Sequence, residues 1–179
     1  MNSDLLNRIE NSTAHTQNRN DNATFIIENL NLIPILIEAS FEIKKKSHFR
    51  ACCILEKVFE LQIGLSLIYL DYICENLYKL KNDSAIRSIS RFVMFLVQDN
   101  SKKSYLSNKQ LLKITEACFD WLIADYRVAV KAHAIYTLFE LGKKEDWINP
   151  ELRNILESDA INHSAGYKSV ARKILKKLN

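Results

Sequence analysis

A short motif occurs four times along the chain and constrains its fold more than any other feature. Each copy has an apolar residue, a cation, and two small residues on either side of a variable one, and the copies occupy residues 49–53, 86–90, 130–134 and 167–171. The cations stand at positions 50, 87, 131 and 168, so successive copies are 37, 44 and 37 residues apart. A period near 40 residues is typical of stacked helix pairs. Because small residues let a helix approach its neighbours closely, the motif predicts packed helical hairpins.

Low glycine and proline contents narrow the choice of secondary structure. The 179 residues include only three glycines and two prolines, well below the roughly 7% and 5% of average proteins. Tight hairpins and phosphate-binding loops depend on these residues, so β-sheets and nucleotide-binding loops are disfavoured. We therefore predict an all-α fold.

The distribution of apolar residues predicts one domain that follows a polar N-terminal segment. Residues 1–21 are rich in Asn, Ser and Thr, and their large aliphatic side chains after the initiator are Leu5, Leu6 and Ile9. We predict a polar lead-in over 1–21 and a single helical repeat domain over 22–179. A chain of this length can bury one sizeable core but is short for two domains.

The repeated motif resembles the HEAT and armadillo-like repeat proteins over most of the chain, and the likeness rests on the second helix of each pair. In HEAT repeats, an aspartate in the turn within a repeat precedes the arginine of that helix by six positions, and the two link neighbouring repeats. Asp125 stands six positions before Lys131, whereas the equivalent positions of the other copies hold Lys44, Lys81 and Asn162. The resemblance implies a right-handed α-α superhelix, a HEAT-like solenoid of about four helix pairs, whose concave groove binds partners.

The motif cations are the first candidate binding residues. Equivalent positions in stacked repeats line up in space, so the four cations are expected to form a row. Two copies add an arginine four positions after the cation. Such a ridge suits phosphates or an acidic peptide, but the same cations could instead bond carboxylates and helix ends of neighbouring repeats, and the sequence leaves both interpretations open. The candidate binding ridge consists of Arg50, Arg87, Arg91, Lys131, Lys168 and Arg172.

A tryptophan and an aspartate form a second candidate site. Trp121 and Asp125 are four positions apart, which places an aromatic ring and a carboxylate side by side on a helix. The segment 121–125 is similar to a motif of the DNA-alkylation-repeat glycosylases, HEAT-like enzymes that use Trp and Asp beside a damaged nucleotide. This similarity implies a DNA-binding, base-excision protein as an alternative. A core tryptophan and a repeat-linking aspartate would explain the same residues without any chemistry.

Other catalytic and metal-binding patterns are absent from the sequence. The histidines and cysteines show no metal-ligand spacing, and no Walker loop, Gly-x-Ser-x-Gly elbow or His-Glu-x-x-His sequence occurs. The fumarase, aspartase and adenylosuccinate lyase group requires a Ser-Ser-x-Met-Pro-x-Lys-x-Asn loop, and the two methionines, Met1 and Met94, lie in no such sequence. We expect no enzymatic activity, no cofactor and no metal ion.

Charge and the N-terminal sequence bear on partners and location. The formal charge of +4 and the pI near 8.8 are compatible with an acidic partner. The N-terminus lacks the cationic start and apolar stretch of a signal peptide, and acidic residues interrupt the apolar segments before they reach about 18 residues. We expect a cytoplasmic protein without a membrane segment that binds a protein or peptide. Nucleic-acid binding and a scaffold or dimerisation role are the alternatives, and the oligomeric state stays open.

Overall fold

The described part of the chain is entirely helical. A computed structural model describes residues 3–159 and 163–178, and every regular element in these ranges is an α-helix or a short 3-10 helix. The predicted all-α fold is therefore confirmed. Residues 1–2 of the predicted lead-in, and residues 160–162 and 179 of the predicted repeat domain, lie outside the described residues.

Contacts within the chain divide it into two compact units, Met1–Phe92 and Val93–Asn179, where the sequence predicts a single domain over 22–179. The boundary between the units falls inside helix α6 (Asp83–Gln98). Chain length limits the size of a core, but it says nothing about how contacts are distributed along the chain. The two units are called the N-terminal unit and the C-terminal unit below.

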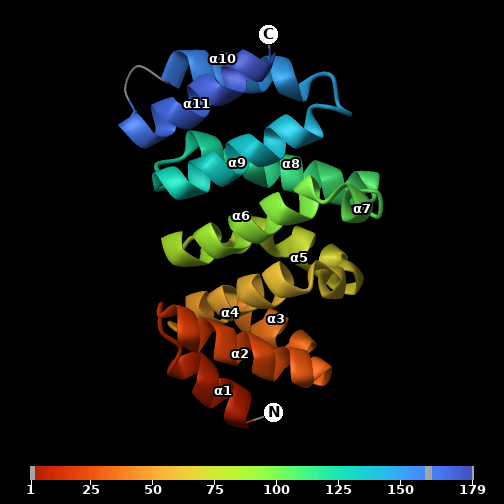
Figure 1. The fold of residues 1–179 in the computed structure, drawn as a ribbon, viewed down its shortest axis with the longest axis vertical. Helices are drawn as coiled ribbons and strands as arrows, with labels where there is room; N and C mark the ends of the chain where they lie inside the picture. The colour runs from red at the N-terminus through yellow and green to blue at the C-terminus, as the bar shows by residue number, and fades with distance from the viewer. Residues whose placement is uncertain (1–2, 160–162, 179) are drawn as a thin grey trace. The chain divides into compact units, whose positions relative to one another are not determined.

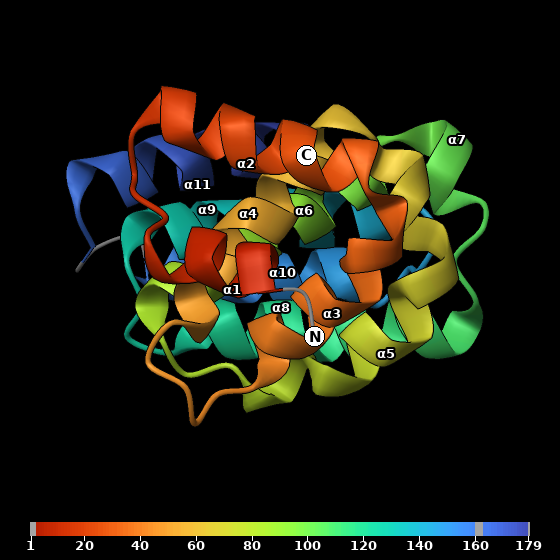
Figure 2. The ribbon, with the colours of Figure 1, turned by 90° about the horizontal axis from the view of Figure 1, so that it is seen from below.

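Helix α4 (His48–Leu61) is at the centre of the N-terminal unit. It contacts α1, α2, α3 and η2, and it lies between α2 and α3 (Figure 2). Ala51, Leu55, Val58 and Phe59 of α4 are completely buried, so one helix supplies much of this core. The other elements of the unit are α1 (Ser3–Glu10), α2 (Thr16–Glu28), η1 (Leu30–Leu32), α3 (Ile33–Phe41), η2 (Ile63–Tyr69), α5 (Leu70–Asn76), η3 (Leu77–Lys79) and the first part of α6.

The described part of the predicted polar lead-in is largely helical. Residues 3–21 form α1 and the beginning of α2, so α2 runs across the predicted boundary at residue 22. Leu5 and Ile9 of α1 are 0% and 3% exposed. These two residues are four positions apart and lie on one face of α1, which packs against α4. Few apolar residues are enough here because a neighbouring helix covers them.

Helix α9 (Val128–Leu141) has the corresponding central place in the C-terminal unit. It contacts α8, α10 and α11 (Figure 1), and Val130, Ala134 and Leu138 are completely buried. Helix α8 begins with a capping box, in which the side chains of Ser107 and Gln110 each accept a hydrogen bond from the other's backbone N–H. Besides the end of α6, the unit contains α7 (Asn100–Lys103), α8 (Asn108–Ile123), α10 (Ile148–Asp159) and α11 (Ala165–Leu178).

Each copy of the repeated motif lies within the first eight residues of a helix, namely α4, α6, α9 and α11. In the N-terminal unit the first copy touches the second, because Cys53 Sγ lies 3.2 Å from Ser88 Oγ. In the C-terminal unit the third copy touches the fourth, since Lys131 Nζ lies 6.0 Å from the centroid of the Tyr167 ring. Within each unit, consecutive copies of the motif are therefore neighbours in space.

No single helix among the described residues is both long enough and apolar enough to cross a membrane. The segments Thr16–Glu28 and Leu30–Phe41 meet that test only as a pair, and they are bent by 103° relative to each other.

Candidate functional site

A hollow in the N-terminal unit gathers three arginines, and we call it the arginine pocket. Its volume is about 320 Å³. Its walls come from the loop between α1 and α2, from α2, from α4, and from the first turns of α6. The lining residues are Ser12, Thr13, Ala14, Arg19, Phe49, Arg50, Cys53, Glu56, Ser84 and Arg87.

Arg50 reaches the pocket from the first turn of α4 and is held by the end of α1. Its Nη1 donates a hydrogen bond to the main-chain oxygen of Glu10 and lies 3.8 Å from the Glu10 carboxylate. Ser47, which precedes α4, donates from Oγ to the same carboxylate at 2.6 Å instead of capping its own helix. The Glu10 pair is half-exposed, so water screens its charge. These contacts fix the direction of the Arg50 side chain at the edge of the pocket.

Arg19 reaches the pocket from α2 and is held by a buried carboxylate. Its Nη2 lies 3.2 Å from Oε2 of Glu56, whose side chain is only 2% exposed. The other oxygen of Glu56 accepts a hydrogen bond from Arg91 at 2.7 Å, and Arg91 also binds Glu60 at 3.0 Å. A buried carboxylate needs such partners, because desolvation without them would be costly. Glu56 thus links α2, α4 and α6, and its charge is shared between two guanidinium groups.

Arg87 is the most available cation of the pocket. It is exposed, and its guanidinium makes no ion pair or hydrogen bond with any residue that the structure describes. Cys53 adds no negative charge nearby, because burial raises the pKa of its thiol above the usual value of 9.0. The lining therefore holds three guanidinium groups and a single carboxylate. This excess of positive charge suits an anionic ligand.

Some residues of the predicted ridge line the arginine pocket, and others lie in different environments. Arg50 and Arg87, which occupy the same motif position, line one pocket. Arg91 follows Arg87 by about one turn of α6, but its guanidinium is bound by Glu56 and Glu60. Two predicted ridge residues are thus placed to meet a ligand, and a third helps to hold the pocket together.

The sequence predicts Lys131 as a residue of the binding ridge, but the structure buries it. Its side chain is buried, with the residue 4% exposed, and Nζ donates a hydrogen bond to the main-chain oxygen of Leu122 at 2.6 Å. Burial lowers the pKa of Lys131, and the nearby charges of Asp159 and Asp125 partly oppose this shift. The resemblance to HEAT repeats implies a direct pair with Asp125, whereas the hydrogen bond found here goes to the end of helix α8. Lys131 has a structural role and cannot bind an external partner in this conformation.

Lys168 and Arg172 belong to α11 in the C-terminal unit. Arg172 is exposed and its Nε donates to the main-chain oxygen of Lys168 at 3.2 Å. Arg172 also lines an open, shallow hollow with Ser169, Lys173 and Lys176. This basic face has few walls, so it offers charge without a defined binding geometry.

Trp121 and Asp125, the second predicted site, do not form an open aromatic and acidic pair. Trp121 lies in α8 and is 4% exposed, so its ring belongs to the core of the C-terminal unit. Asp125 is exposed just after the end of that helix. A base could stack on the ring only if the core opened. The arrangement favours the core tryptophan over the base-excision interpretation.

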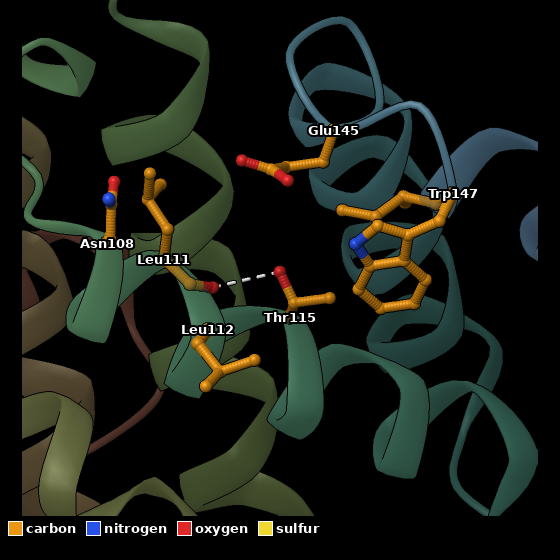
Figure 3. Close-up of a pocket in the computed structure, with 7 residues that line it drawn as sticks. Asn108, Leu111, Leu112, Thr115, Glu145 and Trp147 are labelled. Carbon is orange, nitrogen blue, oxygen red and sulfur yellow. Dashed lines mark hydrogen bonds between the residues drawn. The ribbon is translucent and has the colours of Figure 1, made fainter.

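A second hollow, of about 270 Å³, lies in the C-terminal unit between α8 and the beginning of α10 (Figure 3). Leu111 and Leu112 form its α8 side, where Thr115 donates a hydrogen bond to the main-chain oxygen of Leu111 at 2.8 Å. Trp147, which is half-exposed and stacks on Phe119 at 5.8 Å between ring centroids, forms the opposite side. Among the described residues that line this hollow, Glu145 alone is ionisable, so the hollow lacks the convergent charges of the arginine pocket.

Arg19 and Glu56, which pair with each other and line the pocket, are not among the residues predicted from the sequence. Arg19 lies in the predicted polar lead-in, and Glu56 lies beyond the motif on α4. A signal was present in their spacing, because Glu56 is 37 residues after Arg19 and 35 residues before Arg91. These separations equal about one repeat, so a search for opposite charges one period apart would have found the network.

Comparisons with known proteins identify no relative of the chain. No family model matches it, and neither the curated proteins nor the solved structures contain a significant match. Within residues 3–159 and 163–178, no group of three or more His, Cys, Asp or Glu side chains could hold a metal ion. The class defined by the fold is thus an all-helical protein of packed neighbouring helices, and the arginine pocket is its best-defined site.

Proposed function

We propose that this chain is a non-enzymatic helical-repeat interaction module that binds an acidic segment of a partner protein in the arginine pocket. The observation that carries the proposal is the convergence of Arg19, Arg50 and Arg87 on one hollow that holds a single carboxylate. Clusters of arginine are a recurring means of recognising acidic or phosphorylated segments. Two of these arginines are already oriented by Glu56 and Glu10, which lowers the entropy lost on binding.

We also propose a HEAT-like, right-handed superhelix as the architecture that presents this pocket. The contacts between consecutive motif copies in each unit support the proposal, as do hydrogen bonds between residues about one period apart. In such an architecture, equivalent side chains of successive repeats come together on one surface. A cytoplasmic location agrees with the reduced state expected of the four cysteines, which are all free thiols.

The test is binding of a fluorescent peptide rich in Asp and Glu, followed by anisotropy at low salt. Arg87→Glu should weaken binding at least about tenfold, because an attraction is replaced by a repulsion. The melting temperature should change little, since the Arg87 guanidinium bonds no described residue. Arg172→Glu makes the same charge change on α11 and should leave the affinity nearly intact. Equal losses for the two variants would show that only net charge matters and would end the proposal.

Duplex DNA provides the comparison with the nucleic-acid alternative. The basic face of α11 is the observation that favours this alternative, because Arg172, Lys173 and Lys176 gather there. Binding to phosphates releases counterions from the nucleic acid, and this release is less favourable at high salt, so the affinity falls steeply as salt is added. We expect that any binding to duplex DNA does not depend on Arg87 and therefore persists in Arg87→Glu. A salt-dependent affinity that depends on Arg87 more than on Arg172 would instead support DNA as the ligand of the arginine pocket.

A further inference from the structure

We propose that the arginine pocket recognises a phosphate monoester, presented by the partner segment as a phosphorylated side chain. This inference rests on the proposed function and specifies the chemical group that the pocket takes. It follows from the charge of the lining, from the donors available, and from the size of the hollow.

The charge of the lining matches a dianion better than a monoanion. Three guanidinium groups and one carboxylate line the hollow. The Glu10 carboxylate lies outside this lining, 3.8 Å from Arg50, and it is 60% exposed, so water screens its charge. The neutral thiol of Cys53 does not reduce the positive charge. The Glu56 carboxylate is also bound by Arg91 from outside the lining, so it neutralises Arg19 only in part. A phosphate monoester carries a charge of about −1.5 to −2 at pH 7, whereas a carboxylate or a phosphodiester carries one negative charge. Bringing like charges around one hollow costs free energy, which a dianion relieves more fully.

The donors around the hollow suit phosphate oxygens. Each arginine presents planar N–H groups that can bind two oxygens at once. Glu56 orients Arg19, and the end of α1 orients Arg50, so both are positioned before a ligand arrives. Arg87 makes no bond with the described residues and can turn towards the ligand. The hydroxyl groups of Ser12, Thr13 and Ser84 complete the lining with further donors.

The size of the hollow favours a phosphate group at the end of a side chain over the backbone of a nucleic acid. A volume of about 320 Å³ is at the small end for ligand sites. It accommodates a phosphate group and part of the side chain that carries it. A nucleic-acid backbone instead presents its charges along an extended strand and needs a row of cations. In this unit the nearest candidate for extending such a row, Arg91, is occupied by Glu56 and Glu60.

Small anions test the chemistry of the pocket directly. Methyl phosphate, dimethyl phosphate and acetate are titrated into the full chain, and arginine side-chain resonances are followed by NMR at fixed ionic strength. Methyl phosphate should bind at least about tenfold more tightly than the two monoanions, because of its second charge. Arg87→Gln should lower its affinity about tenfold, while Arg172→Gln, the matched loss of one charge on α11, should not. Equal affinities for the three anions, or equal losses in both variants, would overturn the inference.

Peptides then identify the source of the phosphate. One acidic peptide is prepared with phosphoserine, glutamate or serine at its centre, and its affinity for the full chain is compared with that of free O-phosphoserine. The phosphoserine peptide should bind most tightly, and Arg87→Gln should remove its advantage. If the glutamate peptide binds equally well through Arg87, the phosphate inference fails and the proposed function stands. If no peptide binds, both fail. If free O-phosphoserine binds as tightly as the peptide, the ligand is a small phosphorylated molecule, which contradicts a protein partner.

Discussion

At the scale of the residue, Glu56 explains how a cluster of arginines can exist in the N-terminal unit. Its carboxylate is buried and binds Arg19 from α2 and Arg91 from α6. Buried charges of this kind add little net stability when paired, but removal of one partner leaves the others uncompensated. Glu56 therefore links three helices and also sets the position of Arg19 at the pocket.

Glu56→Ala should lower the free energy of unfolding by about 2 to 4 kcal/mol, because both arginines lose their buried partner. Urea denaturation of the full chain measures this loss. Glu60→Ala is the matched control, since Glu60 binds Arg91 but is 27% exposed. Its cost should stay near about 1 kcal/mol, as expected for a partly solvated pair. Equal costs for the two variants would show that Glu56 does not hold the network together.

The motif cations show why residue type alone does not define a binding residue. Arg87 is exposed, whereas Lys131, at the same motif position, is buried against the Leu122 carbonyl and the Tyr167 ring. The sequence marks both as cations of the repeat. Their exposure depends on the helix that covers each position, which the motif does not specify. Reversal of charge at Lys131 would therefore unfold the C-terminal unit rather than weaken partner binding.

At the scale of the element, α9 shows how the apolar pattern of a helix relates to its packing. Apolar residues on two faces predict a helix buried between neighbours, and α9 contacts α8, α10 and α11. Small residues in the motif permit this close packing. Ala134, for example, is completely buried.

Ala134→Leu should overpack this part of the C-terminal unit and reduce stability by about 1 to 3 kcal/mol. Thermal or urea unfolding measures the effect. Ala165→Leu adds the same side chain at an exposed position of α11 and should change stability by less than about 0.5 kcal/mol. An Ala134→Leu protein as stable as the parent would show that α9 is not tightly packed at this point.

Helices α1 and α2 were harder to predict because their sequence is polar. The hydrophobic face of α1 consists mainly of Leu5 and Ile9, and α2 buries Asn22 beside Ala23 and Ile26. Such a segment resembles a flexible lead-in when it is considered alone. Contacts with α4 make it helical, and those contacts are tertiary.

At the scale of the whole molecule, the sequence predicted the helical class and the elements that carry the motif. The periodicity of apolar residues and the residues that end helices are local features, so they can be recognised in the sequence. The division into two units was not predicted, because it depends on contacts between distant residues. The period of the motif places Arg50 and Arg87 at equivalent positions, and both line the arginine pocket, whereas Arg19 and Glu56 enter it through pairing between helices.

Consecutive copies of the motif are neighbours within each unit, and oxidative cross-linking can detect this proximity in the N-terminal unit. In a Ser88→Cys protein, the introduced cysteine should form a disulfide with Cys53, since the two side chains now lie 3.2 Å apart. Mass spectrometry of the digested protein identifies the linked peptides. Ser90→Cys, two residues further along α6 and equally buried, faces another direction and should not form this link. A missing disulfide in the Ser88→Cys protein, or equal yields from both variants, would show that the first two copies of the motif are not packed as described.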